Sequence, residues 1–163
     1  MEWIRDLLPG QIDLNCISQR FFDKNRYLLN DQRRFGRKFW HYSSSNHPRT
    51  TNVTMRAWAW KVWLAGGEGI VPWNTVRGAE AWNRAEPLTV FYVGKKFGSQ
   101  EPFASLRLKA YRRGQQDIEY LVMLSKRAGW DREAVSRAAS GALDFSGRFS
   151  QSDEEDAGRL FFQ

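Results

Sequence analysis

The sequence predicts an α/β fold built on parallel strands. Short segments at 11–18, 38–44 and 68–74 have the alternating or continuously apolar pattern of strands. Helical segments, above all 53–67 and 106–124, separate and follow them. Strands that alternate with helices form right-handed βαβ units and a parallel sheet. Three such strands cannot close a barrel, because a (β/α)8 barrel typically needs about 250 residues and the chain has 163.

The first segments predict a strand, a short helix and a second strand. In 11–18, apolar residues alternate with more polar neighbours, which is typical of a half-buried strand. A short helix is predicted over 26–35, because Gly36 is a common helix terminator. The segment 38–44 is rich in aromatic residues and precedes a loop of Ser, Asn and Pro, so we predict the second strand there.

The later segments predict a buried helix, two strands and two weaker helices. Segment 53–67 is apolar on more than one side and ends in paired glycines, which indicates a well-buried helix. The third strand, 68–74, is apolar through its centre, as strands covered on both faces are. We predict one short strand, "LTVFYV", within the irregular segment 75–100. Two weaker helices are predicted at 131–142 and 153–161.

The helix around 106–124 is predicted to begin near Pro102 and to carry two unfavourable residues on its apolar face. Gly114 costs about 1 kcal/mol relative to alanine, and Asp117 is too costly to bury without a partner. The apolar stripe, at spacings of three and four, contains Phe103, Leu106, Ala110, Gly114, Asp117, Leu121, Leu124 and Ala128. We therefore predict close packing against another helix at Gly114, and an arginine partner for Asp117.

Three arginines are candidates for that partner. Arg107 lies ten residues before Asp117, about 15 Å along the helix axis, which is too far for direct contact. Arg113 can reach Asp117 only along the helix surface, where an ion pair contributes about 0.3–0.5 kcal/mol. Arg56 lies on the preceding buried helix, so packing between the two helices would bring it across.

Composition limits the function classes. The net charge of +7 raises the question of a nucleic-acid partner, but the basic residues occur in every segment and no recognised binding motif accompanies them, so none is expected. The single cysteine, Cys16, excludes an internal disulfide and a multi-cysteine zinc site. No run approaches the roughly 20 apolar residues that span a bilayer, and the N-terminus lacks a signal-peptide pattern.

Several motifs together resemble the C-terminal part of the catalytic domain of glycoside hydrolase family 123. The long helix is similar to the family pattern S-x-R-L-E-A-L-R-D-G-x-E-D-Y-E-Y-L, with matches at Ser105, Arg107, Leu108, Ala110, Arg112, Gly114, Asp117, Glu119, Tyr120 and Leu121. "RAWAWKVWLAGGEGIVPW" resembles R-x-x-x-W-x-x-W-x-x-G-x-x-G-x-L-x-W, with matches at Arg56, Trp60, Trp63, Gly66, Gly69 and Trp73. "QIDLNCIS", "KFWHY" and "FYVG" resemble its strand-six, strand-seven and Tyr-Pro-Gly segments. The resemblance covers about residues 5–125. Departures from the pattern are Lys109, Arg113, Gln116 and Ile118, where the family has an acid, Asp, Glu and Tyr.

The resemblance implies that residues 1–128 form about strands six to eight, with their helices, of a (β/α)8 barrel, and that 129–163 form a helical tail. It also implies a retaining β-N-acetylgalactosaminidase without metal or cofactor, in which the substrate's acetamide attacks the anomeric carbon and a glutamic acid protonates the leaving oxygen. In the family the acid pair follows an earlier strand, and the acids at 153–156 are better read as a helix start. The isolated chain is therefore expected to be inactive.

The partners implied are an N-acetylhexosaminide and the missing N-terminal half of the barrel, with no membrane. The family is often exported, so the cellular compartment stays open. The alternative function is a non-enzymatic basic module that binds carbohydrate or nucleic acid and retains the barrel motifs.

Barrel sites are built at the C-terminal ends of strands, which selects four candidate substrate-binding residues. Trp73 would provide a platform under a sugar ring or pack in the core, and Tyr42 would hydrogen-bond the sugar or a backbone group. His41 alternates to the other face of its strand and is the packing candidate, while Asn74 would contact ligand or cap a turn. The residues expected to form structural ion pairs are Arg56, Arg107, Asp117 and Glu119.

Overall fold

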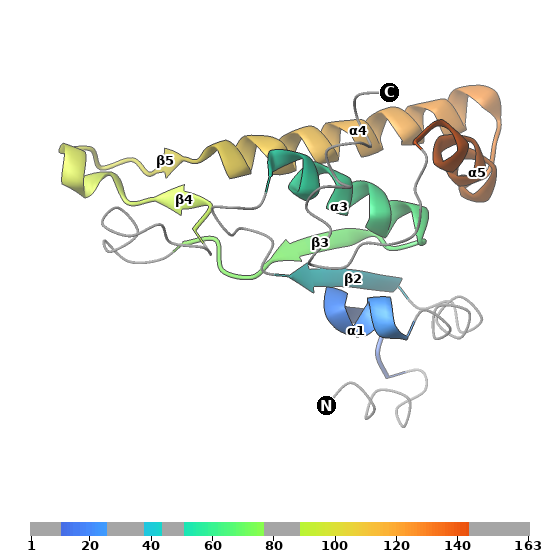
Figure 1. Cartoon of the computed structure of the whole chain (residues 1–163), viewed down its shortest axis with the longest axis horizontal. Coiled ribbons are helices and arrows are strands. Elements are labelled where there is room, and N and C mark those ends of the chain that lie inside the picture. Colours follow the sequence, from blue (N-terminus) through green and yellow to red (C-terminus); the bar gives the residue numbers. More distant parts are fainter. Residues whose placement is uncertain (1–10, 26–37, 44–50, 77–88, 144–163) are drawn as a thin grey trace.

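The computed structural model describes residues 11–25, 38–43, 51–76 and 89–143, which form a mixed α/β structure with a small parallel sheet (Figure 1). The predicted parallel α/β class is confirmed. The predicted helices at 26–35 and 153–161, and the acids at 153–156, lie outside the described residues.

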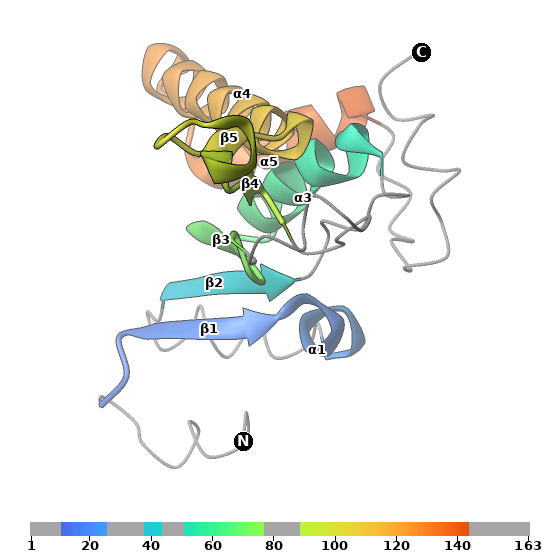
Figure 2. The ribbon, with the colours of Figure 1, turned by 90° about the vertical axis from the view of Figure 1, so that its left-hand side faces the viewer.

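The sheet contains β1 (Leu14–Ser18), β2 (Lys38–Ser43) and β3 (Gly69–Pro72) in the order β1-β2-β3. Both neighbouring pairs are parallel, so the chain crosses over between each strand and the next. Figure 2 shows the three strands stacked one above another, with β1 lowest. Across the described part of the chain the sheet stays open and closes no barrel.

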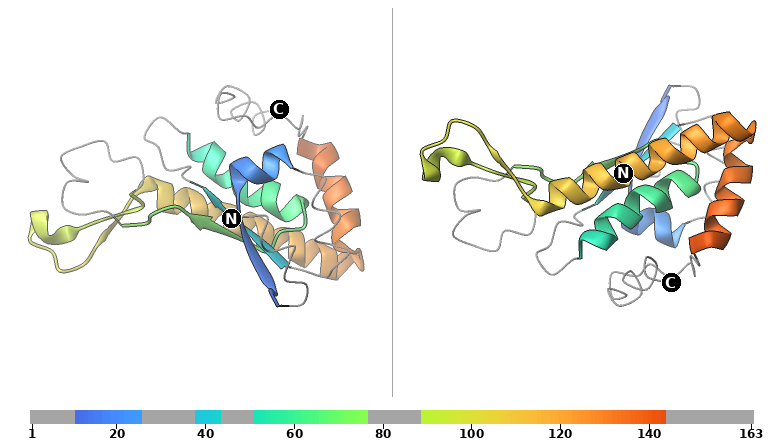
Figure 3. Two further views of the ribbon diagram at one scale, coloured as in Figure 1. Left: turned by 90° about the horizontal axis from the view of Figure 1, so that it is seen from below. Right: turned by 90° about the horizontal axis from the view of Figure 1, so that it is seen from above.

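Two helices, α1 (Gln19–Lys24) and α3 (Asn52–Leu64), lie on the same side of the strands (Figure 3, left). The side chains of β2 therefore alternate between a covered and an uncovered face. Phe39 is 2% exposed, whereas its neighbour Trp40 is 39% exposed. The buried side forms an apolar cluster of Ile17, Phe22 and Phe39. The opposite side, which we call the open face, carries the exposed side chains of Leu14, Cys16 and Trp40. None of the elements that the structure describes covers it.

Helix α4 (Leu106–Ala128) packs along α3, as the right-hand view of Figure 3 shows. The two backbones approach closely at Gly114, where an added Cβ atom would lie 3.1 Å from both the Ala59 Cβ atom and the Arg56 carbonyl oxygen. The predicted close packing at Gly114 is confirmed. The predicted start near Pro102 is wrong, because the hydroxyl of Ser105 caps the helix by accepting a hydrogen bond from the Leu108 N–H.

The apolar stripe of α4 is buried only in its middle, at Ala110, Gly114, Asp117 and Leu121. The ends of the predicted stripe are exposed, namely Phe103, Leu106, Leu124 and Ala128. The reason is length, since α3 has 13 residues and α4 has 23. At 1.5 Å per residue, α3 covers about 20 Å of a helix that is about 35 Å long. Phe103 also lies in a strand and not in the helix.

A narrow arm projects beyond the carboxyl ends of β2 and β3 (Figure 1, left). It consists of the antiparallel strands β4 (Phe91–Tyr92) and β5 (Phe103–Ala104), joined through a 3-10 turn, η3 (Gly94–Phe97). The strand predicted in "LTVFYV" is thus present but only two residues long. Near its tip, Phe97 and Phe103 form an exposed edge-to-face ring pair.

Helix α5 (Arg132–Leu143) packs on α3 and α4 through the cluster of Trp63, Leu121 and Val135. The Arg132 guanidinium lies over the Trp63 ring, 4.7 Å from its centroid. It donates hydrogen bonds to the carbonyl oxygens of Trp63 and Gly67, both at 2.6 Å. A cation is favourable there because the last carbonyls of α3 carry the negative end of its dipole. Arg132 therefore ties α5 to the C-terminal end of α3.

Replacing Arg132 is expected to weaken this junction. Arg132→Ala removes the hydrogen-bond donor of the buried Gly67 carbonyl oxygen, so it should lower the free energy of unfolding by about 1–3 kcal/mol in urea denaturation. Arg137 is a matched control on the same helix, because its exposed ion pair with Glu133 is worth at most about 0.5 kcal/mol. Equal losses in Arg132→Ala and Arg137→Ala would show that the carbonyl contacts do not stabilise the junction.

Candidate functional site

The carboxyl ends of β2 and β3 carry an aromatic pair. Tyr42 lies near the end of β2 and Trp73 directly follows β3, with ring centroids 6.0 Å apart and an angle of 46° between the rings. The backbone N–H of Trp73 donates a hydrogen bond to the Ser43 carbonyl oxygen at 2.6 Å. The pairing of β2 with β3 thus continues to Trp73 and fixes the position of its main chain. Trp73 is 55% exposed, so of its two predicted roles the one in which it packs in the core is not seen. The pair presents two aromatic rings tilted relative to each other, one of which carries a phenol hydroxyl.

Asn74 turns the chain immediately after this pair. Its φ of 56° lies in the left-handed region, which asparagine tolerates better than most residues other than glycine. The next residue, Thr75, accepts hydrogen bonds at 2.9 Å from the N–H groups of Val90 and Phe91, which begin the arm. This position fits the turn role of Asn74, which joins the aromatic pair to the arm.

His41 lies on the opposite face of β2 from Tyr42, among the side chains under α1 and α3. It is 0% exposed and packs edge-on against Phe22, with ring centroids 4.0 Å apart. Neither ring nitrogen has a hydrogen-bond partner among the described residues. Burial, and secondarily the nearby Lys61 charge, lowers the pKa of His41 to about 3. A substrate at Tyr42 and Trp73 cannot reach His41, because adjacent strand residues point to opposite faces.

A buried ion pair lies beside His41. The Lys61 ammonium is 2.7 Å from an Asp23 carboxylate oxygen, and the Lys61 side chain is 8% exposed. It joins α3 to α1 inside the layer between helices and sheet. Lys61 was not singled out from the sequence, although a lysine in a helix that is apolar on several sides is a signal for a buried pair.

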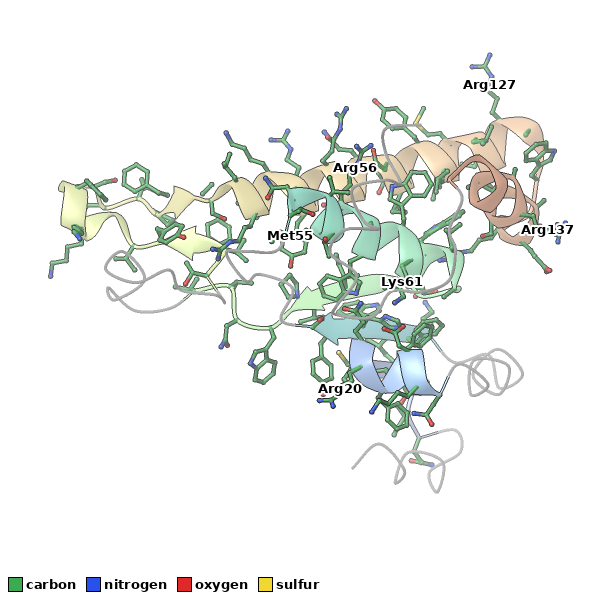
Figure 4. All side chains as sticks on the ribbon, in the orientation of Figure 1. Arg20, Met55, Arg56, Lys61, Arg127 and Arg137 are labelled. Carbon is green, nitrogen blue, oxygen red and sulfur yellow. The ribbon has the colours of Figure 1, made fainter. Side chains whose placement is uncertain are left out.

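The predicted partner of Asp117 is confirmed as Arg56. The Arg56 Nε atom contacts one Asp117 carboxylate oxygen, and its Nη2 atom donates to the other at 2.8 Å. The Trp60 indole N–H donates to the same carboxylate at 3.0 Å. Figure 4 shows Arg56 where α3 meets α4. The contact is a two-pronged, charge-assisted pair reinforced by an indole, so Asp117 belongs to the helix interface and not to the carboxyl edge of the sheet.

The other two residues expected in ion pairs behave differently. Arg107 donates a hydrogen bond at 2.7 Å to the carbonyl oxygen of Thr89, which is fully buried, and so holds the segment before β4 against α4. Glu119 is exposed and makes no ion pair with any described residue. Its expected pairing is not seen, because residue 119 falls on the side of α4 that points away from α3.

Two of the described acids lie away from the aromatic pair. Asp13 and Glu68 precede β1 and β3, at the opposite edge of the sheet, and Glu68 lies 3.7 Å from the Lys38 ammonium. Residues 73–76, directly after β3, contain no acid. Within the described ranges no three His, Cys, Asp or Glu side chains are grouped to hold a metal ion, and no described helix is long and apolar enough to cross a membrane. The pair can therefore hold a ring and hydrogen-bond a hydroxyl, but the segment 73–76 that follows β3 supplies no proton donor beside it.

Comparison of the chain with protein-family models, with curated proteins and with solved structures finds no match.

Proposed function

We propose that this chain forms the C-terminal part of a (β/α)8-barrel glycoside hydrolase similar to family 123, in which it supplies an aromatic sugar-binding surface. The acid pair that performs the chemistry would come from barrel strands outside the chain. The substrate class is a terminal β-linked N-acetylhexosamine. This proposal also gives the unfinished sheet a role, as strands six to eight of the barrel.

One observation carries the proposal, namely that the parallel sheet has an uncovered face and, at its carboxyl edge, an aromatic pair made of the exposed Trp73 and the half-buried Tyr42. Parallel sheets are normally covered on both faces, yet the open face exposes Leu14 and Trp40 to 39% each. In a barrel this face would point inward and become covered by the missing strands. The carboxyl edge, with Tyr42 and Trp73, would then lie at the end of the barrel where active sites are built.

The core of the resemblance consists of residues that meet in space. Arg56 and Trp60 come from one motif and Asp117 from another, and the three make a single network between α3 and α4. Gly69 belongs to the first motif as well, and an added Cβ atom there would lie 2.9 Å from the Trp40 indole. Both arrangements give a physical reason for the residue types that carry the resemblance. They support the barrel assignment.

The proposed chemistry divides the work between the chain and the missing strands. The substrate's acetamide oxygen attacks the anomeric carbon as the bond to the leaving oxygen breaks, and a glutamic acid outside this chain donates the proton that this oxygen takes up. Trp73 would stack on the sugar ring, while the Tyr42 hydroxyl would hydrogen-bond a sugar hydroxyl or the acetamide. These contacts orient the ring but move no proton, so the chain alone is expected to release no sugar.

Sugar binding by the isolated chain tests the role of Trp73. Titration with N-acetylgalactosamine, followed by tryptophan fluorescence, should give weak binding that Trp73→Ala reduces about tenfold, a loss of about 1.4 kcal/mol. Trp130 is the matched control, because it is similarly exposed, at 45%, but follows α4 away from the sheet. Sugar binding that survives Trp73→Ala and disappears in Trp130→Ala would contradict the assignment of this edge.

The hydrolytic activity of the pure chain tests whether the proton donor lies outside the chain. No release of 4-nitrophenol from 4-nitrophenyl N-acetyl-β-D-galactosaminide is expected, since a positioned acid contributes about 10²–10⁴-fold. Steady turnover that is abolished by replacing Asp13, Glu68 or Glu119 would place the acid within the chain. That result would overturn the proposed need for upstream strands while leaving the sugar-binding surface in place.

A further inference from the structure

The outer face of α4, on the side away from α3, gathers positive charge. Its exposed residues include five cations, which are Lys109, Arg112, Arg113, Lys126 and Arg127, and a single acid, Glu119. Lys109 and Arg127 are eighteen residues apart, so the face extends for about 27 Å. The exposed Tyr120 (66%) and Met123 (62%) lie among these charges. We call this surface the basic face of α4.

The arrangement is unfavourable for the helix taken alone. Lys109 has like-charged neighbours at both helical spacings, Arg112 three residues on and Arg113 four residues on. Like charges at these spacings destabilise a helix, whereas opposite charges stabilise it. A surface selected only for solubility would intersperse acids with the cations. The basic face of α4 has one acid for five cations, which suits an external polyanion.

Several other cations in the described structure contact groups of the chain itself. Arg56 binds Asp117, Lys61 binds Asp23, Lys38 lies near Glu68, and Arg132 binds the carbonyls at the end of α3. By contrast, none of the five cations of the basic face has an ion-pair partner among the described residues. The sequence alone suggested that the positive charges are dispersed, but the helix collects five of them on one side.

We propose that the basic face of α4 binds single-stranded nucleic acid, with the cations contacting phosphates and Tyr120 stacking on a base. This role is independent of the proposed sugar-binding edge. Proteins that bind single strands combine positive surfaces along the backbone with exposed aromatic rings, as this face does. A duplex fits less well, because an α-helix reads it by entering the major groove, and α4 lies flat against α3 over its central turns (Figure 3, right). An anionic membrane fits less well too, because the middle of the face, between Arg113 and Lys126, carries the acid Glu119 and no continuous apolar stripe.

Fluorescence anisotropy with a labelled 20-nucleotide oligo(dT) tests the proposal on the full chain. Binding should weaken with KCl, with a slope of log K against log[KCl] near −3, from about 0.7 per phosphate contact and four to five contacts. The double variant Arg112→Glu, Arg113→Glu should bind at least tenfold more weakly and reduce the slope by about 1.4. The matched control is Lys95→Glu, Lys96→Glu, which makes the same charge change in the exposed turn of the arm and should stay within about threefold of the wild type. Far-UV circular dichroism checks folding, and Arg112→Gln, Arg113→Gln provides a milder version of the variant.

Further measurements distinguish single-stranded nucleic acid from other polyanions. Tyr120→Ala should weaken oligo(dT) binding about fivefold or more, because stacking contributes to it, but leave binding to inorganic polyphosphate, which has no bases, unchanged. No measurable binding, or equal weakening by the α4 and arm variants, would overturn the proposal. Tighter binding to a 20-base-pair duplex or to phosphatidylserine vesicles would likewise overturn it in favour of those partners.

Discussion

Asp117→Asn is expected to lower the free energy of unfolding by about 3 kcal/mol. The substitution removes the charge from a carboxylate whose side chain is 8% exposed and which binds Arg56 and the Trp60 indole. Breaking one partner of a buried pair typically costs about 3–5 kcal/mol. The lower end applies because the Arg56 side chain is 32% exposed and can recover part of its hydration. Urea denaturation monitored by tryptophan fluorescence measures the change.

Glu119→Gln is the matched control for that experiment. It makes the same chemical change two residues later on α4, at an exposed acid without an ion-pair partner in the described structure, so it should stay within about 0.5 kcal/mol of the wild type. A further check is sugar binding, which Asp117→Asn should leave unchanged. If Asp117→Asn abolished sugar binding at an unchanged melting temperature, Asp117 would belong to the site and not to the helix interface.

Stability is expected to fall in acid because of His41. Burial lowers the pKa of His41 from 6.5 to about 3, so the folded state favours the neutral ring. The unfolded chain therefore binds a proton at pH values where the folded chain does not. The stabilisation is fully present above pH 6.5 and is lost as the pH falls towards 3, at about 1.36 kcal/mol per pH unit and roughly 5 kcal/mol in total. Denaturation curves between pH 7 and pH 5 measure about 2 kcal/mol of this loss before most carboxylates are titrated.

His41→Phe should flatten that dependence. A phenyl ring suits the aromatic surroundings of Phe22 and Phe39 and has no nitrogen to protonate. The remaining pH dependence then reports the carboxylates, including Asp23 beside Lys61. The chain has a second histidine, His47. If His47→Gln rather than His41→Phe removed the acid sensitivity, the role assigned to His41 would be wrong.

The partner of Asp117 could be predicted from the sequence, whereas the surroundings of His41 could not. Asp117 was recognisable because its helical spacing placed a carboxylate on an apolar stripe, and a buried charge requires a partner. The partner followed from elimination among three arginines, of which only Arg56 lay on another buried helix. For His41, alternation along β2 indicated the face opposite Tyr42. It could not indicate the aromatic enclosure or the Lys61 charge, because these come from α1 and α3.

The sequence by itself determined most of the local elements and their order, although α1 was not predicted. Alternation, helical periodicity and the glycine signals located β1, β2, β3, α3 and α4, because these patterns depend on neighbours within a few residues. Only the tertiary structure decided which residues share a surface. It left Trp73 exposed beside Tyr42, buried only the middle of the α4 stripe, and placed Arg132 on the end of α3. These outcomes depend on the relative lengths and positions of packed elements, and no pattern within a single segment contains that information.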